Sequence, residues 1–102
     1  MTEKLDSQES PPRRPARRRG KAEIWSGILE LCTRTWRTQT WLRRKMGLKT
    51  ETVRVALSFL LKADLLEQRN NPNTQNMEYS TNKRGETALA QYYLLFTKYF
   101  TP

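Results

Sequence analysis

Residues 38–66, TQTWLRRKMGLKTETVRVALSFLLKADLL, decide the fold of this chain. They read as two helices joined by a tight turn at Met46, Gly47 and Leu48, where the glycine supplies a permissive backbone. Thr38 or Thr40 caps the first of these helices, and Thr50 is the expected N-cap of the second. This pairing is typical of the helix-turn-helix, which sets its second helix in the DNA major groove.

The second helix of this pair has two different faces. One face is an apolar stripe with helical spacing, predicted to be buried: Val53, Ala56, Leu57, Leu60 and Leu61. The other face is short, polar and basic, and we expect it to read bases through Thr50, Glu51, Thr52, Arg54, Val55 and Ser58. Arg54 suits guanine, Glu51 can accept from cytosine, and Thr52 or Val55 can touch a thymine methyl group.

Lys and Arg residues outside this face are expected to contact DNA phosphates, which supply affinity rather than sequence information. In the first helix of the pair, Leu42 and Met46 are expected to point to the core, so the consecutive basic residues between them cannot all be buried. The predicted phosphate contacts are Arg37, Arg43, Arg44, Lys45, Lys49 and Arg69.

Length and charge narrow the class of protein. The chain has 102 residues, enough for one ordinary domain, and carries 19 Lys and Arg against 10 Asp and Glu, a net charge of +9. Such a balance favours a polyanionic partner, nucleic acid first and an anionic membrane second. No apolar run approaches the roughly 20 residues that span a bilayer, and no secretory leader is visible. We therefore expect a cytoplasmic, nucleoid-associated protein with no membrane partner.

Catalysis and metal binding are disfavoured by composition. The chain has no histidine and a single cysteine, Cys32, which sits among apolar residues and reads as a small buried thiol. Its acidic residues read as surface charge, and no phosphate-cradling glycine loop is present. We expect no enzyme activity, no metal, no cofactor and no small-molecule substrate.

The N-terminal residues 1–20 read as a disordered basic arm, because they contain three prolines and few sizeable apolar side chains. Five arginines gather at the end of this arm: Arg13, Arg14, Arg17, Arg18 and Arg19. Such an arm can follow phosphates or enter a minor groove, and the alternative is a solvated tail.

Residues 21–100 read as one domain, mostly helical with a small β hairpin. We expect a helix over 21–34, a brief strand over 35–38, the helix pair, a strand over 65–69 and a returning strand over 77–81. The loop between the last two strands is long and amide-rich, and suits a wing that reaches a groove through Asn71, Asn73 and Gln75. The alternative is an ordinary solvated loop.

Asn82 is the expected cap of a last helix that runs to about Tyr99. Its aromatic stripe exceeds what the end of a small domain can bury, so a second copy is expected to cover it. The predicted homodimer interface consists of Leu89, Tyr92, Tyr93, Phe96, Tyr99 and Phe100. The alternative is a monomer whose last helix packs wholly on its own domain.

The order of these elements matches a winged helix, and the chain from about Lys21 to Tyr99 resembles the small winged helix-turn-helix DNA-binding proteins of archaeal genomes, plasmids and viruses. In the first two helices the resemblance is carried by Lys21, Ala22, Glu23, Ile24, Ile28, Leu29, Glu30, Thr40 and Leu42. Further on it is carried by residues 48–53, Leu57, Phe59, Leu60, Leu61, Leu65, Leu66, Tyr79, Ser80, Thr81, Asn82, Gly85, Leu89 and Tyr92.

The chain departs from this family at two positions. Asp64 stands where the family has glycine, and Asn82 stands where it often has threonine; each can serve the same purpose. The resemblance implies sequence-specific binding of double-stranded DNA, commonly as a dimer, and usually control of transcription. Two alternatives remain: a non-specific architectural DNA binder, and a winged-helix adaptor that docks onto another protein.

Overall fold

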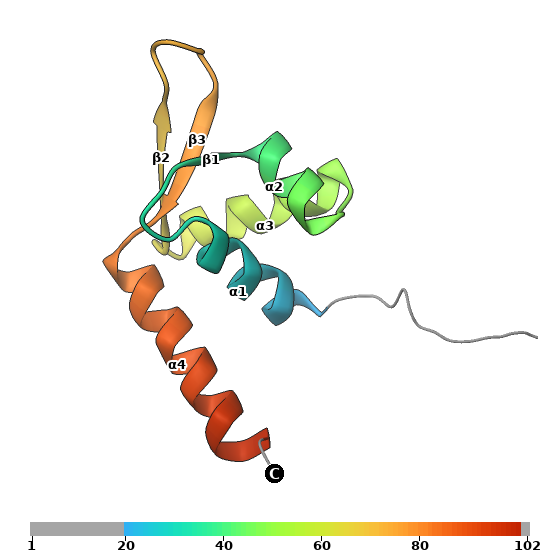
Figure 1. The fold of residues 1–102 in the computed structure, drawn as a ribbon, viewed down its shortest axis with the longest axis vertical. Helices are drawn as coiled ribbons and strands as arrows, with labels where there is room; N and C mark the ends of the chain where they lie inside the picture. The colour runs from blue at the N-terminus through green and yellow to red at the C-terminus, as the bar shows by residue number, and fades with distance from the viewer. Residues whose placement is uncertain (1–19, 101–102) are drawn as a thin grey trace, which may run out of the picture.

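The computed structural model describes residues 20–100, with side chains described as far as residue 95. Four helices and three strands follow one another as α1 (Lys21–Leu31), β1 (Arg37–Thr38), α2 (Gln39–Met46), α3 (Thr50–Lys62), β2 (Leu66–Asn70), β3 (Met77–Thr81) and α4 (Lys83–Phe100) (Figure 1). This order confirms the predicted fold class, a mostly helical winged helix-turn-helix. The predicted arm, residues 1–19 of it, lies outside the described residues.

The three strands form an antiparallel sheet in the order β1-β3-β2. The β2–β3 hairpin pairs Leu66 with Thr81 at its base and Asn70 with Met77 near its tip, and β1 joins through the pairing of Arg37 with Tyr79. The hairpin projects from one end of the helical body and α4 extends from the other (Figure 1). The tip of the wing therefore lies far from the C-terminal end of α4.

The hydrophobic core of the described residues lies between α1, α2 and α3. The α3 stripe predicted from the sequence supplies four of its residues, with Val53 fully buried and Leu60 1% exposed, while Leu61 is half-buried at its edge. Each fully buried branched or aliphatic side chain contributes about 1.5–3 kcal/mol relative to an exposed one. The core consists of Ile28, Leu29, Cys32, Leu42, Met46, Val53, Ala56, Leu57, Leu60 and Leu66.

The first helix is shorter than its sequence pattern predicts: α1 ends at Leu31, and Arg34 lies in the left-handed region with a φ of 60°. Tertiary contacts explain the early end. The carbonyl oxygen of Cys32 accepts a hydrogen bond from the backbone N–H of Thr81 (3.0 Å) and another from the Ser80 hydroxyl (3.3 Å). The chain is thereby diverted toward the sheet, and β1 is limited to two residues rather than the predicted four.

The structure decides the N-caps of α2 and α3, which the sequence had left open or predicted. Thr38 caps α2, because its hydroxyl accepts from the backbone N–H of Trp41 at 3.1 Å. The prediction that Thr50 caps α3 is wrong: Thr50 is the first helical residue, and Lys49 is the N-cap without a side-chain hydrogen bond. The Lys49 carbonyl already accepts the N–H of Val53 at 3.1 Å, and Glu51 in the first turn compensates the helix dipole.

Left-handed backbone occurs at two predicted positions. Gly47 ends α2 with a φ of 66°, and Asp64 follows α3 with a φ of 62°, as its place in the family pattern implied. Beyond them, β2 begins at Leu66, one residue later than predicted. Asn82 caps α4 as expected, since its side-chain oxygen accepts the N–H of Gly85 at 2.8 Å.

None of the helices in the described part of the chain combines the length and the apolar character that a bilayer crossing demands.

Candidate nucleic-acid interface

The outward face of α3 carries the side chains predicted to read bases. Five of the six are exposed, and Thr52 is half-buried; the exposed ones are Thr50, Glu51, Arg54, Val55 and Ser58. Lys62 continues the face at the C-terminal end of the helix. Because the buried residues of α3 all lie on the opposite side, this face is free to meet a ligand.

Glu51 and Arg54 form an ion pair on this face, one helical turn apart. Arg54 donates from Nε to one carboxylate oxygen of Glu51 at 3.1 Å, and from Nη2 to the other oxygen. Both side chains remain open to solvent, 59% exposed for Arg54 and 70% for Glu51. The hydrogen bond and the charge of Arg54 lower the pKa of Glu51 and, reciprocally, Glu51 raises the pKa of Arg54. The two predicted base readers therefore act as one unit.

The basic residues at the end of α2 lie next to this face through the Gly47 turn. Arg44, Lys45 and Lys49 are exposed, and none of them forms an ion pair with another described residue. Arg43 is half-buried. Exposed cations without an intramolecular partner are suited to phosphate contacts.

The other two predicted phosphate contacts are engaged with tryptophan rings. The Cζ atom of Arg37 lies 4.0 Å from the ring centroid of Trp41, and its Nε is buried without a hydrogen-bond partner among residues 20–95. The Cζ atom of Arg69 lies 4.3 Å from the ring centroid of Trp36. A phosphate would have to approach the remaining nitrogens of these guanidinium groups.

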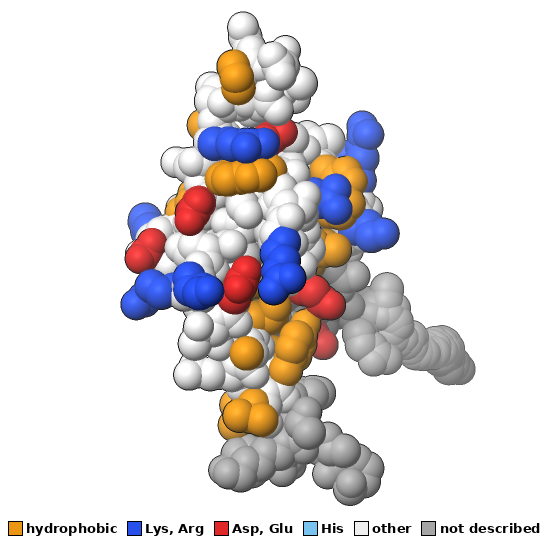
Figure 2. All heavy atoms as spheres, turned by 60° about the vertical axis from the view of Figure 1, so that its left-hand side comes forward, with side chains coloured by type: hydrophobic (Ala, Val, Ile, Leu, Met, Phe, Trp, Pro, Cys, Tyr) orange, Lys and Arg blue, Asp and Glu red, His pale blue; other side chains and the backbone are white. Residues whose placement is uncertain are grey.

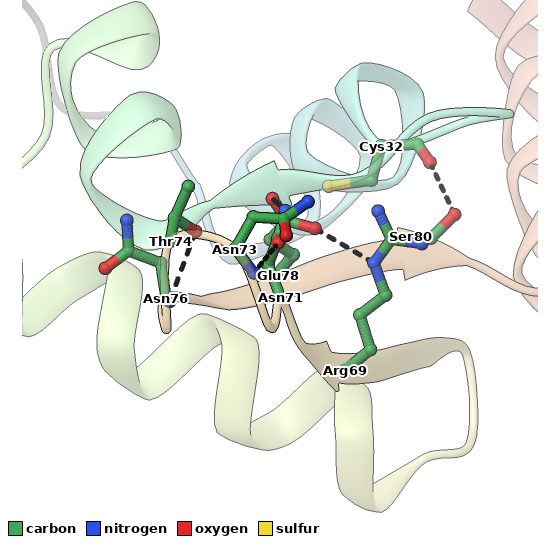
Figure 3. Close-up of polar contacts among 8 residues, drawn as sticks. All are labelled: Cys32, Arg69, Asn71, Asn73, Thr74, Asn76, Glu78 and Ser80. Carbon is green, nitrogen blue, oxygen red and sulfur yellow. Dashed lines mark hydrogen bonds and ion pairs between the residues drawn. The ribbon is translucent and has the colours of Figure 1, made fainter.

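A hydrogen-bond network near the tip of the wing places the predicted wing residues in two groups (Figure 3). Glu78 accepts from Arg69 Nε at 2.9 Å and from Asn71 Nδ2 at 3.1 Å, and these two bonds, Asn71 first, lower the pKa of Glu78. The Asn71 side-chain oxygen accepts the backbone N–H of Asn73 at 2.9 Å. Asn71 is thus part of the turn, whereas the side chains of Asn73 and Gln75 are exposed at the tip.

Charge on the surface is mixed rather than uniform. Figure 2 shows a face on which Lys and Arg side chains lie among Asp and Glu side chains across the middle of the molecule, with hydrophobic side chains gathered below them. A hydrophobic groove of about 400 Å³ lies between α1 and α3, where Trp25 stacks on Phe59 with ring centroids 4.1 Å apart. The outward face of α3 is therefore polar on one side and apolar on the side next to α1.

The predicted dimer residues of α4 lie in different surroundings. Leu89 packs against the core of its own domain, and Tyr92 is half-buried. The Tyr93 hydroxyl donates to Glu30 of α1 at 2.8 Å, although the ring is 43% exposed. The side chains of Phe96, Tyr99 and Phe100 lie outside the described ones. Among the described side chains of α4, Leu94 and Leu95 are the most exposed apolar ones, at 67% and 52%.

One contact of the interface had no usable sequence signal. Trp36 lies against Arg69 of β2, 33 positions further along the chain and beyond the reach of any local pattern. The contact of Arg37 with Trp41 is local, between positions i and i+4. The coupling of Glu51 with Arg54 did have a signal, since opposite charges at i and i+3 on a helix are neighbours.

Helix-turn-helix, three-stranded sheet and projecting hairpin together define a winged helix. A family model described as "Winged helix-turn-helix" matches residues 18–99, and the chain belongs to this family. That confirms the family expected from the sequence in its general form, while an archaeal, plasmid or viral origin stays a prediction. No curated protein sequence matches the chain significantly.

Solved structures of transcription regulators have a similar fold. The regulator BldR from Sulfolobus solfataricus is 12% identical with a TM-score of 0.66, over 74% of this chain and 58% of BldR. A MarR family transcription regulator is 26% identical with a TM-score of 0.60, over 76% of this chain and 58% of the regulator. A single-residue mutant of ZitR from Lactococcus lactis, solved in complex with DNA, is 19% identical with a TM-score of 0.55, over 76% of this chain and 62% of ZitR. The chain therefore spans less than two thirds of the length of these regulators.

Proposed function

We propose that this protein binds double-stranded DNA sequence-specifically as a homodimer and regulates transcription. The observation that carries the proposal is the outward face of α3, where Arg54 and Ser58 are exposed next to Arg44 and Lys45, which form no ion pair with another described residue. A net charge of +9 supports a polyanionic partner. The similar fold of a regulator solved in complex with DNA supports the same reading.

In this proposal α3 enters the major groove and reads bases, while neighbouring segments contact phosphates. Arg44, Lys45 and Lys49 hold phosphates and set the position of the helix. Arg54 reads a guanine, and Thr52 or Val55 contacts a thymine methyl group. The wing tip places Asn73 and Gln75 along the minor groove or its phosphates, and the arginine-rich residues 13–19 supply further phosphate contacts.

Two copies would join through their α4 helices. Leu94 and Leu95 are exposed on the part of α4 that extends away from the wing (Figure 1), where a second copy removes them from water. Two recognition helices carried by such a dimer would meet successive major grooves of a roughly palindromic site, about 34–36 Å apart.

A binding experiment on the full chain tests this function. Duplexes are first selected from a random pool, and the selected site is then titrated at 50 and 200 mM salt against a random duplex competitor. We expect the selected site to bind at least about 10³-fold more tightly than random DNA, with strong salt dependence. Equal affinity for both would identify an architectural binder, and no binding at 50 mM salt would point to a protein-docking adaptor.

A further inference from the structure

We propose that Glu51 positions Arg54 for base reading and does not itself read a base. This inference rests on the proposed function and assigns Glu51 a role different from the cytosine contact expected from the sequence. It starts from the two hydrogen bonds that tie both carboxylate oxygens of Glu51 to the guanidinium group of Arg54.

The nitrogens that bind Glu51 determine which hydrogen-bond donors of Arg54 remain available for a base. A guanidinium group has two edges that can donate a pair of parallel hydrogen bonds, one from Nε and Nη2 and one from Nη1 and Nη2. Glu51 takes the first edge, with Nε donating at 3.1 Å. The second edge has no partner among the described residues, and a pair of donors of this kind matches O6 and N7 of guanine. Glu51 therefore leaves available the edge that reads a base.

The charge of the pair has a second consequence. An isolated arginine at a DNA surface is attracted to any phosphate, whatever the sequence. The ion pair with Glu51 is neutral as a whole, and the carboxylate repels phosphates. Phosphate contact by Arg54 is thus disfavoured relative to hydrogen bonding with a base edge.

Glu51 lies in the first turn of α3, where a negative charge compensates the helix dipole, but the same charge has a cost on a surface that meets phosphates. It is the single acidic residue of α3 and shares the outward face with Arg54. An acidic group on such a surface lowers affinity for all DNA. This cost is offset if Glu51 improves discrimination, because specificity depends on the difference between affinities and not on affinity alone.

Two substitutions of Glu51 distinguish its role in positioning Arg54 from the effect of its negative charge. Glu51→Gln keeps the length of the side chain and removes the charge, whereas Glu51→Asp keeps the charge but is too short for the same paired contact. We expect both variants to lose about two- to tenfold of the preference at the one base pair that Arg54 reads. Only Glu51→Gln should bind random DNA more tightly, with its salt slope steeper by about 0.9.

Glu86→Gln is the matched control, since Glu86 also lies in the first turn of a helix, α4. It removes the same charge away from α3 and should leave base preference unchanged. In an Arg54→Ala background the Glu51 substitutions should have no further effect at that base pair, because the residue being positioned is absent.

The results that overturn the proposal are distinct from failure of the proposed function. A loss of preference at a different base pair from that of Arg54 would show that Glu51 reads a base directly. A Glu51→Asp variant with the base preference of the native protein would show that only the charge matters. Absence of specific binding by the unmodified chain would instead refute the function on which the proposal rests.

Discussion

The hydroxyl of Thr81, at the end of the wing, donates a hydrogen bond of 2.7 Å to the carbonyl oxygen of Leu29 in α1, and Thr81 is 6% exposed. The Thr33 hydroxyl donates to the same oxygen, also at 2.7 Å. The backbone N–H of Thr33, which would continue the helix by bonding to that oxygen, bonds instead to Glu30 at 3.2 Å. Two side chains thus satisfy a carbonyl left open at the end of α1 and tie the wing to the helical core.

Replacing these threonines by valine tests this shared contact. Thr81→Val and Thr33→Val should each lower the free energy of unfolding by about 1 kcal/mol. The double variant should lose more than the sum, because only then does the Leu29 carbonyl lack both hydroxyl partners. Urea denaturation measures this, with the exposed Thr87→Val as control; strict additivity would contradict the interpretation.

Gly85 lies where α4 passes close to the backbone before β2. A Cβ atom at this position would collide with the carbonyl oxygen of Leu65 and lie 2.6 Å from Thr81 Cγ2. Gly85→Ala should therefore cost about 1–3 kcal/mol of stability. Thermal unfolding measures the loss, and an unchanged midpoint would refute the close approach.

Gly27→Ala is the matched control for Gly85→Ala. A Cβ atom on Gly27 would meet the end of the flexible Met46 side chain, at 2.8 Å from Cε. That methyl group can move, and alanine favours a helix over glycine by about 1 kcal/mol. We expect this variant to be near neutral or more stable.

Burial raises the pKa of the Cys32 thiol from 9.0 to about 12, and the charge of Arg37 offsets this only in part. Above pH 9 the unfolded chain releases the thiol proton and the folded chain retains it, so stability falls as pH rises. We expect the free energy of unfolding to fall between pH 8 and pH 10 by about 1 kcal/mol more than in Cys32→Ala. A thiol reagent at pH 8 should react only with unfolded protein; rapid reaction would show that the thiol is accessible.

Arg54 is expected to contact a base and Arg44 a phosphate, so their substitutions should have different effects on DNA binding. Arg54→Ala should lower discrimination at one base pair by about 1–3 kcal/mol. Arg44→Ala should weaken all DNA similarly and reduce the salt slope by about 0.9. Both are measured by titrating the selected and a random duplex at several salt concentrations; unchanged specificity in Arg54→Ala would show that another part of α3 reads the sequence.

The proposed dimer depends on the exposed apolar end of α4. A Leu94→Glu and Leu95→Glu double variant should be monomeric by light scattering at micromolar concentration, while the unmodified chain is a dimer. Gln91→Glu, on an exposed position of the same helix, should stay dimeric. A monomeric unmodified chain would refute the dimer directly.

Much of the fold was predictable because it depends on local periodicity. The α3 stripe, the left-handed Gly47 and the Asn82 cap were all predicted from residues within one or two turns of each other. The predicted N-cap at Thr50 is wrong because cap position depends on backbone angles: Lys49 is the last extended residue, with φ −75° and ψ 152°, and Thr50 is already helical. For the candidate interface, the sequence identified which side of α3 is exposed.

What the sequence determined by itself was the set of surfaces: an apolar face that has to be buried and a polar, cationic face that remains in water. Only the tertiary structure decided which partners the individual side chains contact. Trp36 supports Arg69, and Thr81 ends α1, through contacts between residues far apart in the chain. Such contacts depend on how helices and strands pack in three dimensions, and packing joins residues that no sequence period connects.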